Sequence, residues 1–394
     1  MYVIKNNEIT NLENKRLVVR KEDKEIEIHA GDAKFIDNTR IGNNKWLLGP
    51  TYMEIYPTMN CNERCSFCYV GNSLSYEKKK MNKATVDVVS KQVGDIGIFN
   101  SAVLGGEPFM YDELEYLIKK LYDSGSEVSL STNGTVHNFE LMKRLTKFDT
   151  GFNVSFHSCN ESLHNAIVKN SIAYKLTVET IKFLLETSSP EYVNISLVVN
   201  NTNFYNVLET MDFVRNLGIK SMSIYHAQGS GFAHNNNDSN VPFNKWVELI
   251  GKVKNKGKEI GLRVKPVTNY PFLVEDDLNF SPDPYLSRFM YGTNDGRRAV
   301  YVNYDGNIYA TSYNFMDSRF CIGNITKDNL LDVWGNSGLL QAIRNNRHPE
   351  ECEECKFFEL CRGGPIKNYN LSEYLSEYTG KTPECPIHSQ AYTE

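Results

Sequence analysis

The sequence predicts an α/β protein whose largest part is an incomplete barrel of parallel strands and helices. From residue 51 onward, six runs of β-type residues are each followed by an amphipathic stretch of helix length, which is the pattern of parallel βα units. Residues 1–50 instead alternate apolar and polar in short pieces, and the chain becomes rich in Pro and Asp after about residue 265. We therefore expect a β-rich extension over 1–50, a partial (β/α)6 barrel over 51–270, and a linker with a small domain over 271–394.

The expected strands and helices alternate along the barrel. The strands are 51–59, 101–106, 127–134, 152–158, 194–200 and 221–231, and the helices that follow them are 84–95, 112–125, 139–148, 173–186, 206–218 and 243–257. Gly, Ser, Asn, His or Cys residues follow each strand. Because the carboxyl ends of parallel strands lie at one edge of such a sheet, these residues are expected to form a site together.

The segments beyond the last helix are expected to be less regular. Two segments read as linkers: residues 265–272, which contain Pro, and residues 279–285, which contain Pro and Asp. The segment YVNYDGNIYAT that follows predicts a β-hairpin that turns at Asp305 and Gly306.

Composition limits the classes of function. The chain has 394 residues, of which 41% are hydrophobic and 23% charged, and no apolar run approaches the ~18 residues of a membrane span. The first residues, MYVIKNNEITNLENK, lack the apolar core of an export signal, so a cytoplasmic protein without a membrane segment is expected. The net charge of -5 argues against a nucleic-acid partner.

Seven of the nine cysteines form two groups whose spacing indicates metal or iron–sulfur ligation. The groups are Cys61, Cys65 and Cys68, and Cys352, Cys355, Cys361 and Cys385. Three thiolates can hold three corners of a cubane cluster and leave one iron open, whereas a zinc knuckle would need a further ligand such as His157 or Cys159. The second group offers four thiolates, which suit structural zinc and an iron–sulfur cluster about equally.

The first group and the ends of the next strands resemble the radical S-adenosylmethionine (radical SAM) superfamily. Its features are a C-x3-C-x2-C loop with an aromatic residue before the last cysteine, a GGEP segment, a T-N-G segment and an S-x-D-G segment. The matching residues are Cys61, Cys65, Phe67 and Cys68 in the loop, Gly105, Gly106 and Glu107 in GGEP, Asn133 in T-N-G, and Ser155 as the serine of S-x-D-G. His157 departs from the pattern because it stands where the family usually has Asp, and no Arg follows near Lys169.

This resemblance implies a TIM-like radical SAM barrel with a [4Fe-4S] cluster on the three cysteines of the first group. The open iron would bind S-adenosylmethionine, and the other matching residues would contact that cofactor. One electron from the cluster would then cleave the cofactor into methionine and a 5'-deoxyadenosyl radical, which removes hydrogen from unactivated C–H bonds.

The second group resembles the SPASM domain, a C-terminal extension of radical SAM enzymes that carries auxiliary [4Fe-4S] clusters. The C-x2-C-x5-C spacing, the Gly-Gly after it, the preceding hairpin and the CIGNI segment all match. Full SPASM domains hold two clusters, but Thr311 and Pro365 occupy the positions of two of the cysteines. We therefore expect one auxiliary cluster on the second group, with Cys321 and Cys159 as plain buried thiols.

Enzymes of this kind mostly act on peptides or proteins, so the resemblance implies oxidative modification of a peptide, with crosslinking of a ribosomal peptide as the leading interpretation. The implied partners are a precursor peptide or protein, an external electron donor and a separate leader-peptide recognition protein, although residues 1–50 could clasp a leader by strand addition. A sulfatase-maturase-like protein oxidase, a cofactor-pathway enzyme for a small molecule, and a non-enzymatic zinc-binding scaffold remain alternatives. The sequence does not identify the group that takes a proton from the substrate.

Overall fold

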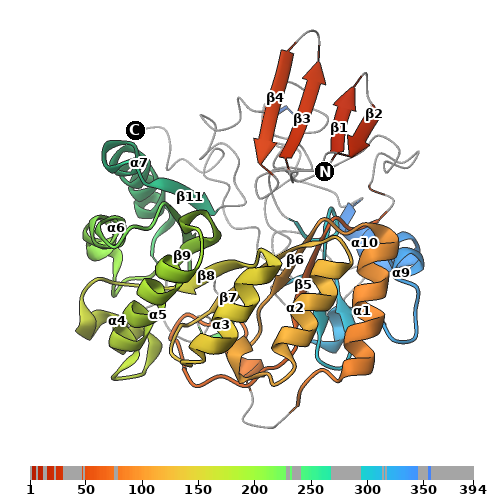
Figure 1. The fold of residues 1–394 in the computed structure, drawn as a ribbon, viewed down its shortest axis with the longest axis horizontal. Coiled ribbons are helices and arrows are strands. Elements are labelled where there is room, and N and C mark those ends of the chain that lie inside the picture. The colour runs from red at the N-terminus through yellow and green to blue at the C-terminus, as the bar shows by residue number, and fades with distance from the viewer. Residues whose placement is uncertain are drawn as a thin grey trace.

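The computed structural model describes most of the chain from residue 47 to 344 and four strands before it. The described residues are 2–5, 8–11, 16–21, 24–29, 47, 49–74, 79–227, 231–232, 241–267, 294–312, 315, 317–344 and 354–355. They form one sheet of four strands and one of ten strands, with helices packed on the larger sheet (Figure 1).

The larger sheet contains the expected parallel strands in chain order. They are β5 (Tyr52–Tyr56), β6 (Asn100–Val103), β7 (Glu127–Thr132), β8 (Gly151–Ser155), β9 (Val193–Val199), β10 (Ser221–His226) and β11 (Arg263–Val267). Each strand pairs in parallel with the next one. The six predicted strands are therefore confirmed, and within the described residues β5 and β11 do not pair with each other, so the sheet is open.

The last of these strands, β11, corrects the sequence prediction. The presence of Pro266 predicts a linker from residue 265, yet residues 263–267 pair in register with β10. Proline is tolerated here because β11 is the terminal strand on its side of the sheet, where a missing N–H removes no hydrogen bond from an inner ladder.

The helices of the βα units lie on one side of the large sheet (Figure 1). They are α1 (Lys83–Ile96), α2 (Leu114–Asp123), α3 (Phe139–Leu145), α4 (Glu161–Val168), α5 (Ala173–Thr187), α6 (Val207–Asn216) and α7 (Phe243–Ile260). The side chains of Asn82, Asn138 and Asn160 cap α1, α3 and α4 by accepting a backbone N–H of the first turn. α4 is not among the predicted helices, and it lies between β8 and α5.

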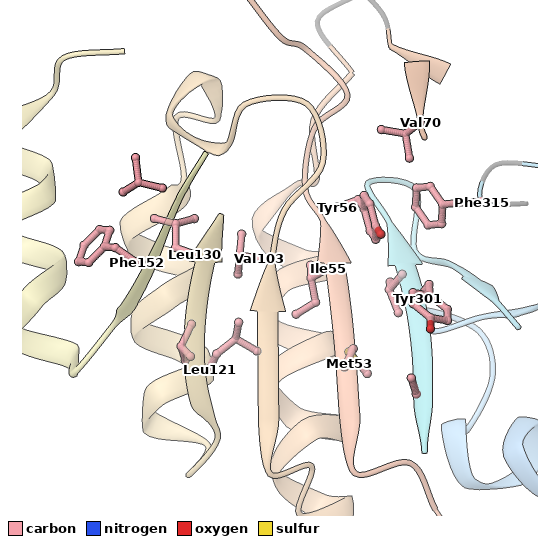
Figure 2. Packing of buried hydrophobic residues seen from close by; sticks show 14 of the residues in the cluster. Met53, Ile55, Tyr56, Val70, Val103, Leu121, Leu130, Phe152, Tyr301 and Phe315 are labelled. Carbon is pink, nitrogen blue, oxygen red and sulfur yellow. The ribbon is translucent and has the colours of Figure 1, made fainter. Parts of the chain in front are cut away.

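The two faces of the large sheet differ in chemistry. Toward the helices, Met53, Ile55, Val103 and Leu130 are fully buried in one apolar cluster that also includes Leu121 of α2 (Figure 2). The alternate residues point the other way and are mostly polar. We call this the polar face, and its partly exposed members include Glu54, Ser129, Ser131, Asn153, Ser155, Asn194, Ser196 and Ser223.

The C-terminal part extends the same sheet on the other side of β5. β12 (Ala299–Asn303) runs parallel to β5, and β13 (Asn307–Tyr309) and β14 (Cys321–Asn324) follow as antiparallel strands. The predicted hairpin at Asp305 and Gly306 is confirmed, and Gly306 has a φ of 79°, which a side chain would oppose. α9 (Leu330–Asn336) and α10 (Gly338–Arg344) come next.

One side chain of α1 ties this C-terminal part to the helices of the barrel. The Gln92 amide donates to the carbonyls of Ile325 and Asp328 at 2.8 and 3.0 Å and accepts the N–H of Leu330 at 2.7 Å. Three backbone groups at the start of α9 and just before it thus bond to a single barrel residue.

The first residues form the small separate sheet. Its strands are β1 (Tyr2–Lys5), β2 (Glu8–Asn11), β3 (Arg16–Lys21) and β4 (Lys24–His29), in the order β2-β1-β3-β4. The prediction that the extension is β-rich is confirmed for these residues.

Candidate cluster and cofactor site

The first cysteine group lies in one loop at the carboxyl end of β5. Cys61, Cys65 and Cys68 are free and partly buried, and the Cys68 N–H donates to the carbonyl of Cys65 at 3.1 Å. The carbonyls of Ile167 and Val168, at the end of α4, accept the backbone N–H groups of the residues on either side of Cys65 at 3.0 and 3.2 Å. The unpredicted helix α4 therefore holds the middle of the loop.

Burial sets the protonation of these thiols. It raises the pKa of Cys61 to about 12 and that of Cys68 to about 11, and it raises the pKa of Cys65 strongly as well. Thiols in such a place stay protonated until a metal takes the place of the protons.

The GGEP segment packs directly on the start of this loop. The N–H of Gly106 donates to the Thr58 carbonyl at 2.9 Å, and the N–H of Glu107 donates to the Asn60 carbonyl at 2.7 Å. A Cβ on Gly106 would lie 2.7 Å from the carbonyl carbon of Met59 and closer still to the Asn60 carbonyl. Only glycine permits this approach, which fixes the loop after β6 against the loop after β5.

The carboxylate of Glu107 joins the ends of β6 and β7. It is almost completely buried and accepts three hydrogen bonds, from the Thr132 hydroxyl at 2.8 Å and from the backbone N–H groups of Phe109 and Asn133 at 3.0 and 2.8 Å. Burial raises the pKa of Glu107 to about 7, although the three donors oppose that rise. Glu107 is thus rigidly held by its own chain.

Asn133 contacts the cysteine loop through its side chain. Its amide donates to the Asn62 side chain at 2.8 Å, and its oxygen accepts the N–H of Thr135 at 2.8 Å. Asn62 in turn donates to the Thr135 hydroxyl at 2.7 Å. The structure therefore brings the T-N-G segment beside the cysteines, as predicted, through two partners that the sequence reading did not single out.

Phe67 and His157 pack against each other, and Ser155 is a member of the polar face. The rings of Phe67 and His157 meet edge to face at 4.7 Å, and His157 Nδ1 accepts the Val198 N–H at 3.2 Å. Burial and His164 hold the pKa of His157 well below its usual value, so this ring is neutral. Ser155 pairs in register with Ser196 on the neighbouring strand.

The loop after β10 reaches back to the third cysteine. The Phe232 N–H donates to the Cys68 carbonyl at 2.9 Å, and Gly231 has a φ of 58°. A Cβ on Gly231 would lie 2.6 Å from the carbonyl carbon of Tyr69. Residues 231–232 therefore cover the end of the cysteine loop.

One carboxyl group and three tyrosine hydroxyls form a hydrogen-bonded network between the polar face and the cysteine loop. Glu54 accepts the hydroxyls of Tyr52 and Tyr56 at 3.2 and 2.6 Å, and the Tyr56 hydroxyl shares a hydrogen bond of 2.8 Å with Tyr69, which directly follows Cys68. Burial raises the pKa of Glu54 to about 7. Sequence reasoning missed this network because its members are separated along the strand and the loop.

Sequence reasoning also missed Glu63, the middle residue between Cys61 and Cys65. Its side chain is buried, with 3% of its surface exposed, and Oε2 lies 3.6 Å from Cys65 Sγ. Within the described part of the chain, Oε1 has no hydrogen-bond partner. Burial and the nearby Glu107 raise the pKa of Glu63 to about 8. The only signal in the sequence is a Glu inside the C-x3-C spacing.

The thiols and carboxyl groups around the cysteine loop fit the positively charged core of an iron–sulfur cluster and a cationic cofactor. Three thiols are soft ligands that suit iron–sulfur clusters, and the two buried carboxyl groups of Glu63 and Glu107 lie around them. A bound cation would lower the raised pKa values of both carboxyl groups, because it favours their ionised form.

The second cysteine group falls mostly beyond the described residues. Cys355 is described and partly buried, whereas Cys352, Cys361 and Cys385 are outside the described ranges, as is Pro365. Thr311 is fully buried, and its hydroxyl donates to Asp295 at 3.0 Å.

Comparison with known proteins identifies the domains. The radical SAM superfamily matches residues 55–214, and an iron–sulfur cluster-binding domain of the SPASM type matches residues 294–356. The chain carries a radical SAM domain and a SPASM domain. It is a radical SAM enzyme. Such an enzyme uses a [4Fe-4S] cluster with S-adenosylmethionine, and its SPASM domain binds auxiliary iron–sulfur clusters. This excludes the non-enzymatic zinc scaffold.

Relatives of the radical SAM enzyme differ in what they make. This chain is 23% identical over 358 residues to the antilisterial bacteriocin subtilosin biosynthesis protein AlbA of Bacillus subtilis, and the alignment covers 85% of this chain and 71% of AlbA. It is 23% identical over 331 residues to Fe-coproporphyrin III synthase of Methanosarcina barkeri, covering 78% and 80%. The crystal structure of Streptococcus suis SuiB bound to precursor peptide SuiA shares the fold, with a TM-score of 0.70 and 18% identity over 83% of this chain and 74% of SuiB.

Among the described residues, no helix is both long and apolar enough to cross a bilayer.

Proposed function

We propose that this radical SAM enzyme oxidatively modifies a peptide by removing hydrogen from a C–H bond, with crosslinking of a ribosomally made precursor as the reaction. The observation that carries the proposal is the position of the cysteine loop at the carboxyl end of β5, beside a polar face that the open sheet leaves partly exposed. An open, polar face can take an extended chain whose backbone needs hydrogen-bond partners. Similarity to AlbA and to SuiB, which has been solved with a precursor peptide, supports the same substrate class.

In this proposal the chain's own residues hold and shield the reacting groups. Cys61, Cys65 and Cys68 would bind the cluster. When bound there, the cluster and S-adenosylmethionine supply a 5'-deoxyadenosyl radical. Glu107 and Asn133 would fix the adjoining loops, because their hydrogen bonds tie β6, β7 and the cysteine loop together. Such fixed loops exclude water and keep the target C–H in reach.

The remaining matching residues would contact the cofactor around this frame. Gly105 and Gly106 would bring backbone groups close to it, and Ser155 would offer a hydroxyl from the polar face. Phe67 would act indirectly, because its ring packs on His157 and on the end of α4.

The C-terminal domain would supply the route for the second electron. Crosslinking removes two hydrogens from the substrate, so an electron acceptor is needed besides the radical, and one auxiliary [4Fe-4S] cluster on Cys352, Cys355, Cys361 and Cys385 would serve. The bond between Thr311 and Asp295 supports a single cluster, since that threonine replaces a ligand and is engaged elsewhere. An external electron donor would start each turnover.

The small N-terminal sheet would bind the precursor peptide. Within the described residues β2 and β4 are its outer strands, and an outer strand can add a peptide strand. A separate leader-recognition protein would be needed if this sheet does not bind the leader.

A direct experiment uses a short peptide encoded beside the gene. Anaerobic co-expression with the enzyme should lower the peptide mass by two hydrogens for each crosslink, and the variant with Ala at Cys61, Cys65 and Cys68 should leave the mass unchanged. The peptide proposal would be wrong if wild-type enzyme left the peptide mass unchanged and instead converted an iron porphyrin or another small molecule. The substrate class would then be the one that the name of the Methanosarcina relative indicates.

A further inference from the structure

Glu63 combines deep burial with an oxygen that its own chain leaves without a donor. Only 3% of its surface is exposed, and within the described residues Oε1 accepts no hydrogen bond. Buried carboxyl groups are normally paired or fully hydrogen-bonded, so this unmet acceptor calls for a partner from outside the described residues.

The neighbouring cation does not pair with this carboxyl group. The guanidinium of Arg64 donates instead to the backbone carbonyls of Cys61 and Glu63, at 2.8 and 2.6 Å. The described residues therefore provide no ion pair for the Glu63 side chain, although a positive group is adjacent in the sequence.

The second carboxylate of the site has a different arrangement. Glu107 accepts three hydrogen bonds from Thr132, Phe109 and Asn133, so its oxygens serve the frame of the site. Glu63 lies in the same group, because Oε2 is 3.6 Å from Cys65 Sγ and both carboxyl groups act electrostatically on Cys61. Of the two, Glu63 is the one with an oxygen left over for a guest.

We propose that Glu63 is a binding residue for the positively charged sulfonium end of S-adenosylmethionine. The inference rests on the assignment of Cys61, Cys65 and Cys68 as cluster ligands, and it is independent of which substrate is modified. In its ionised form, a buried carboxyl group beside the cluster attracts a cationic cofactor more strongly than a neutral one of the same shape. Glu63 would thus favour the intact cofactor over S-adenosylhomocysteine, whose sulfur is uncharged.

The test compares these two ligands on reconstituted protein. Wild type, Glu63→Gln, Glu63→Asp and the surface control Glu161→Gln are loaded anaerobically to equal iron content, and the affinity of each for S-adenosylmethionine and S-adenosylhomocysteine is measured by equilibrium dialysis. Glu161 suits the control because it is exposed at the start of α4, outside the cysteine loop. We expect Glu63→Gln to bind S-adenosylmethionine roughly tenfold more weakly, or about 1.4 kcal/mol, with a much smaller change for S-adenosylhomocysteine.

The other two variants set the limits of the result. Glu63→Asp should keep most of the preference because it keeps the charge, and Glu161→Gln should match wild type. Equal weakening of both ligands in Glu63→Gln, or none, would overturn the proposal. A Glu63→Gln protein that takes up clearly less iron than wild type would overturn it too, because the carboxyl group would then serve assembly of the cluster on Cys61, Cys65 and Cys68.

A second measurement needs neither cluster nor cofactor. If the carboxyl group is kept for a guest, metal-free Glu63→Leu should melt at the same temperature as metal-free wild type or higher, since an unmet buried acceptor is removed. A clear fall in melting temperature would show that Glu63 stabilises the fold itself, against the proposal. Failure of the cysteine assignment is distinguished separately, because it would leave the triple Cys→Ala variant with the full iron content of wild type, whereas a correct assignment leaves only the iron of the auxiliary cluster.

Discussion

Replacing Gly106 with Ala should damage the site through one methyl group. A Cβ there would lie 2.7 Å from the carbonyl carbon of Met59, inside the 3.0 Å that real Cβ atoms essentially never cross, and closer still to the Asn60 carbonyl. The loops after β5 and β6 must then separate. This strains the hydrogen bonds of 2.9 and 2.7 Å that Gly106 and Glu107 donate to Thr58 and Asn60. At about 1 kcal/mol for each hydrogen bond plus strain, we expect a loss of about 2–4 kcal/mol of unfolding free energy.

The assay is urea unfolding of metal-free protein, followed by iron content after reconstitution. Gly251→Ala is the matched control, because Gly251 lies within α7 and a Cβ there would meet nothing within 4 Å. That control should be about 0.5–1 kcal/mol more stable than wild type, as expected for Ala in a helix. Equal unfolding midpoints and equal iron in Gly106→Ala and wild type would refute the steric argument.

Three further outcomes are expected. Gln92→Leu leaves the carbonyls of Ile325 and Asp328 and the N–H of Leu330 without their side-chain partner, so urea unfolding should show a loss of about 1–3 kcal/mol, and an unchanged midpoint would contradict it. Thr132→Val removes one donor to Glu107 and should cost about 1–2 kcal/mol at pH 8, measured in the same way, with Thr132→Ser as the control that keeps the hydroxyl. Burial lowers the pKa of His164 to about 4, so the imidazole binds a proton more readily in the unfolded chain than in the folded one. The contribution of His164 to the free energy of unfolding is therefore fully present above the unfolded pKa of about 6.5. About 3 kcal/mol of that free energy is lost as pH falls toward 4. A His164→Gln variant should lose less stability over that range, and identical pH profiles in unfolding experiments would disprove the assignment.

The sequence predicts the repeating parts of this fold well because burial repeats with them. On β5 and β7 the alternation of apolar and polar residues is regular, and both strands are found where they are predicted. β11 escapes prediction because Pro266 opposes a strand everywhere except at a sheet edge, and the sequence does not say which strand is last. α4 escapes because eight residues within a loop give too short a periodic signal.

The site is predicted in its motifs but not in its supports. Glu107 and Asn133 belong to recognisable segments, and the structure brings them together beside the cysteine loop. Glu63 and Glu54 belong to no motif. Only tertiary packing distinguishes them from the other carboxyl groups, because it shields them from solvent and raises their pKa. Burial of a single polar side chain depends on contacts between segments far apart in the sequence, so local patterns do not reveal it.

The pairing of β12 with β5 bears on how the enzyme can be shortened. β5 leads into the cysteine loop and is flanked by β6 on one side and by β12 on the other. A fragment that stops at residue 270 would uncover the edge of β5 that pairs with β12, and the backbone N–H and C=O groups along that edge would face solvent. An uncovered inner strand invites edge-to-edge aggregation. A recombinant minimal barrel would therefore be expected in inclusion bodies, unless the C-terminal strands are supplied as a second polypeptide.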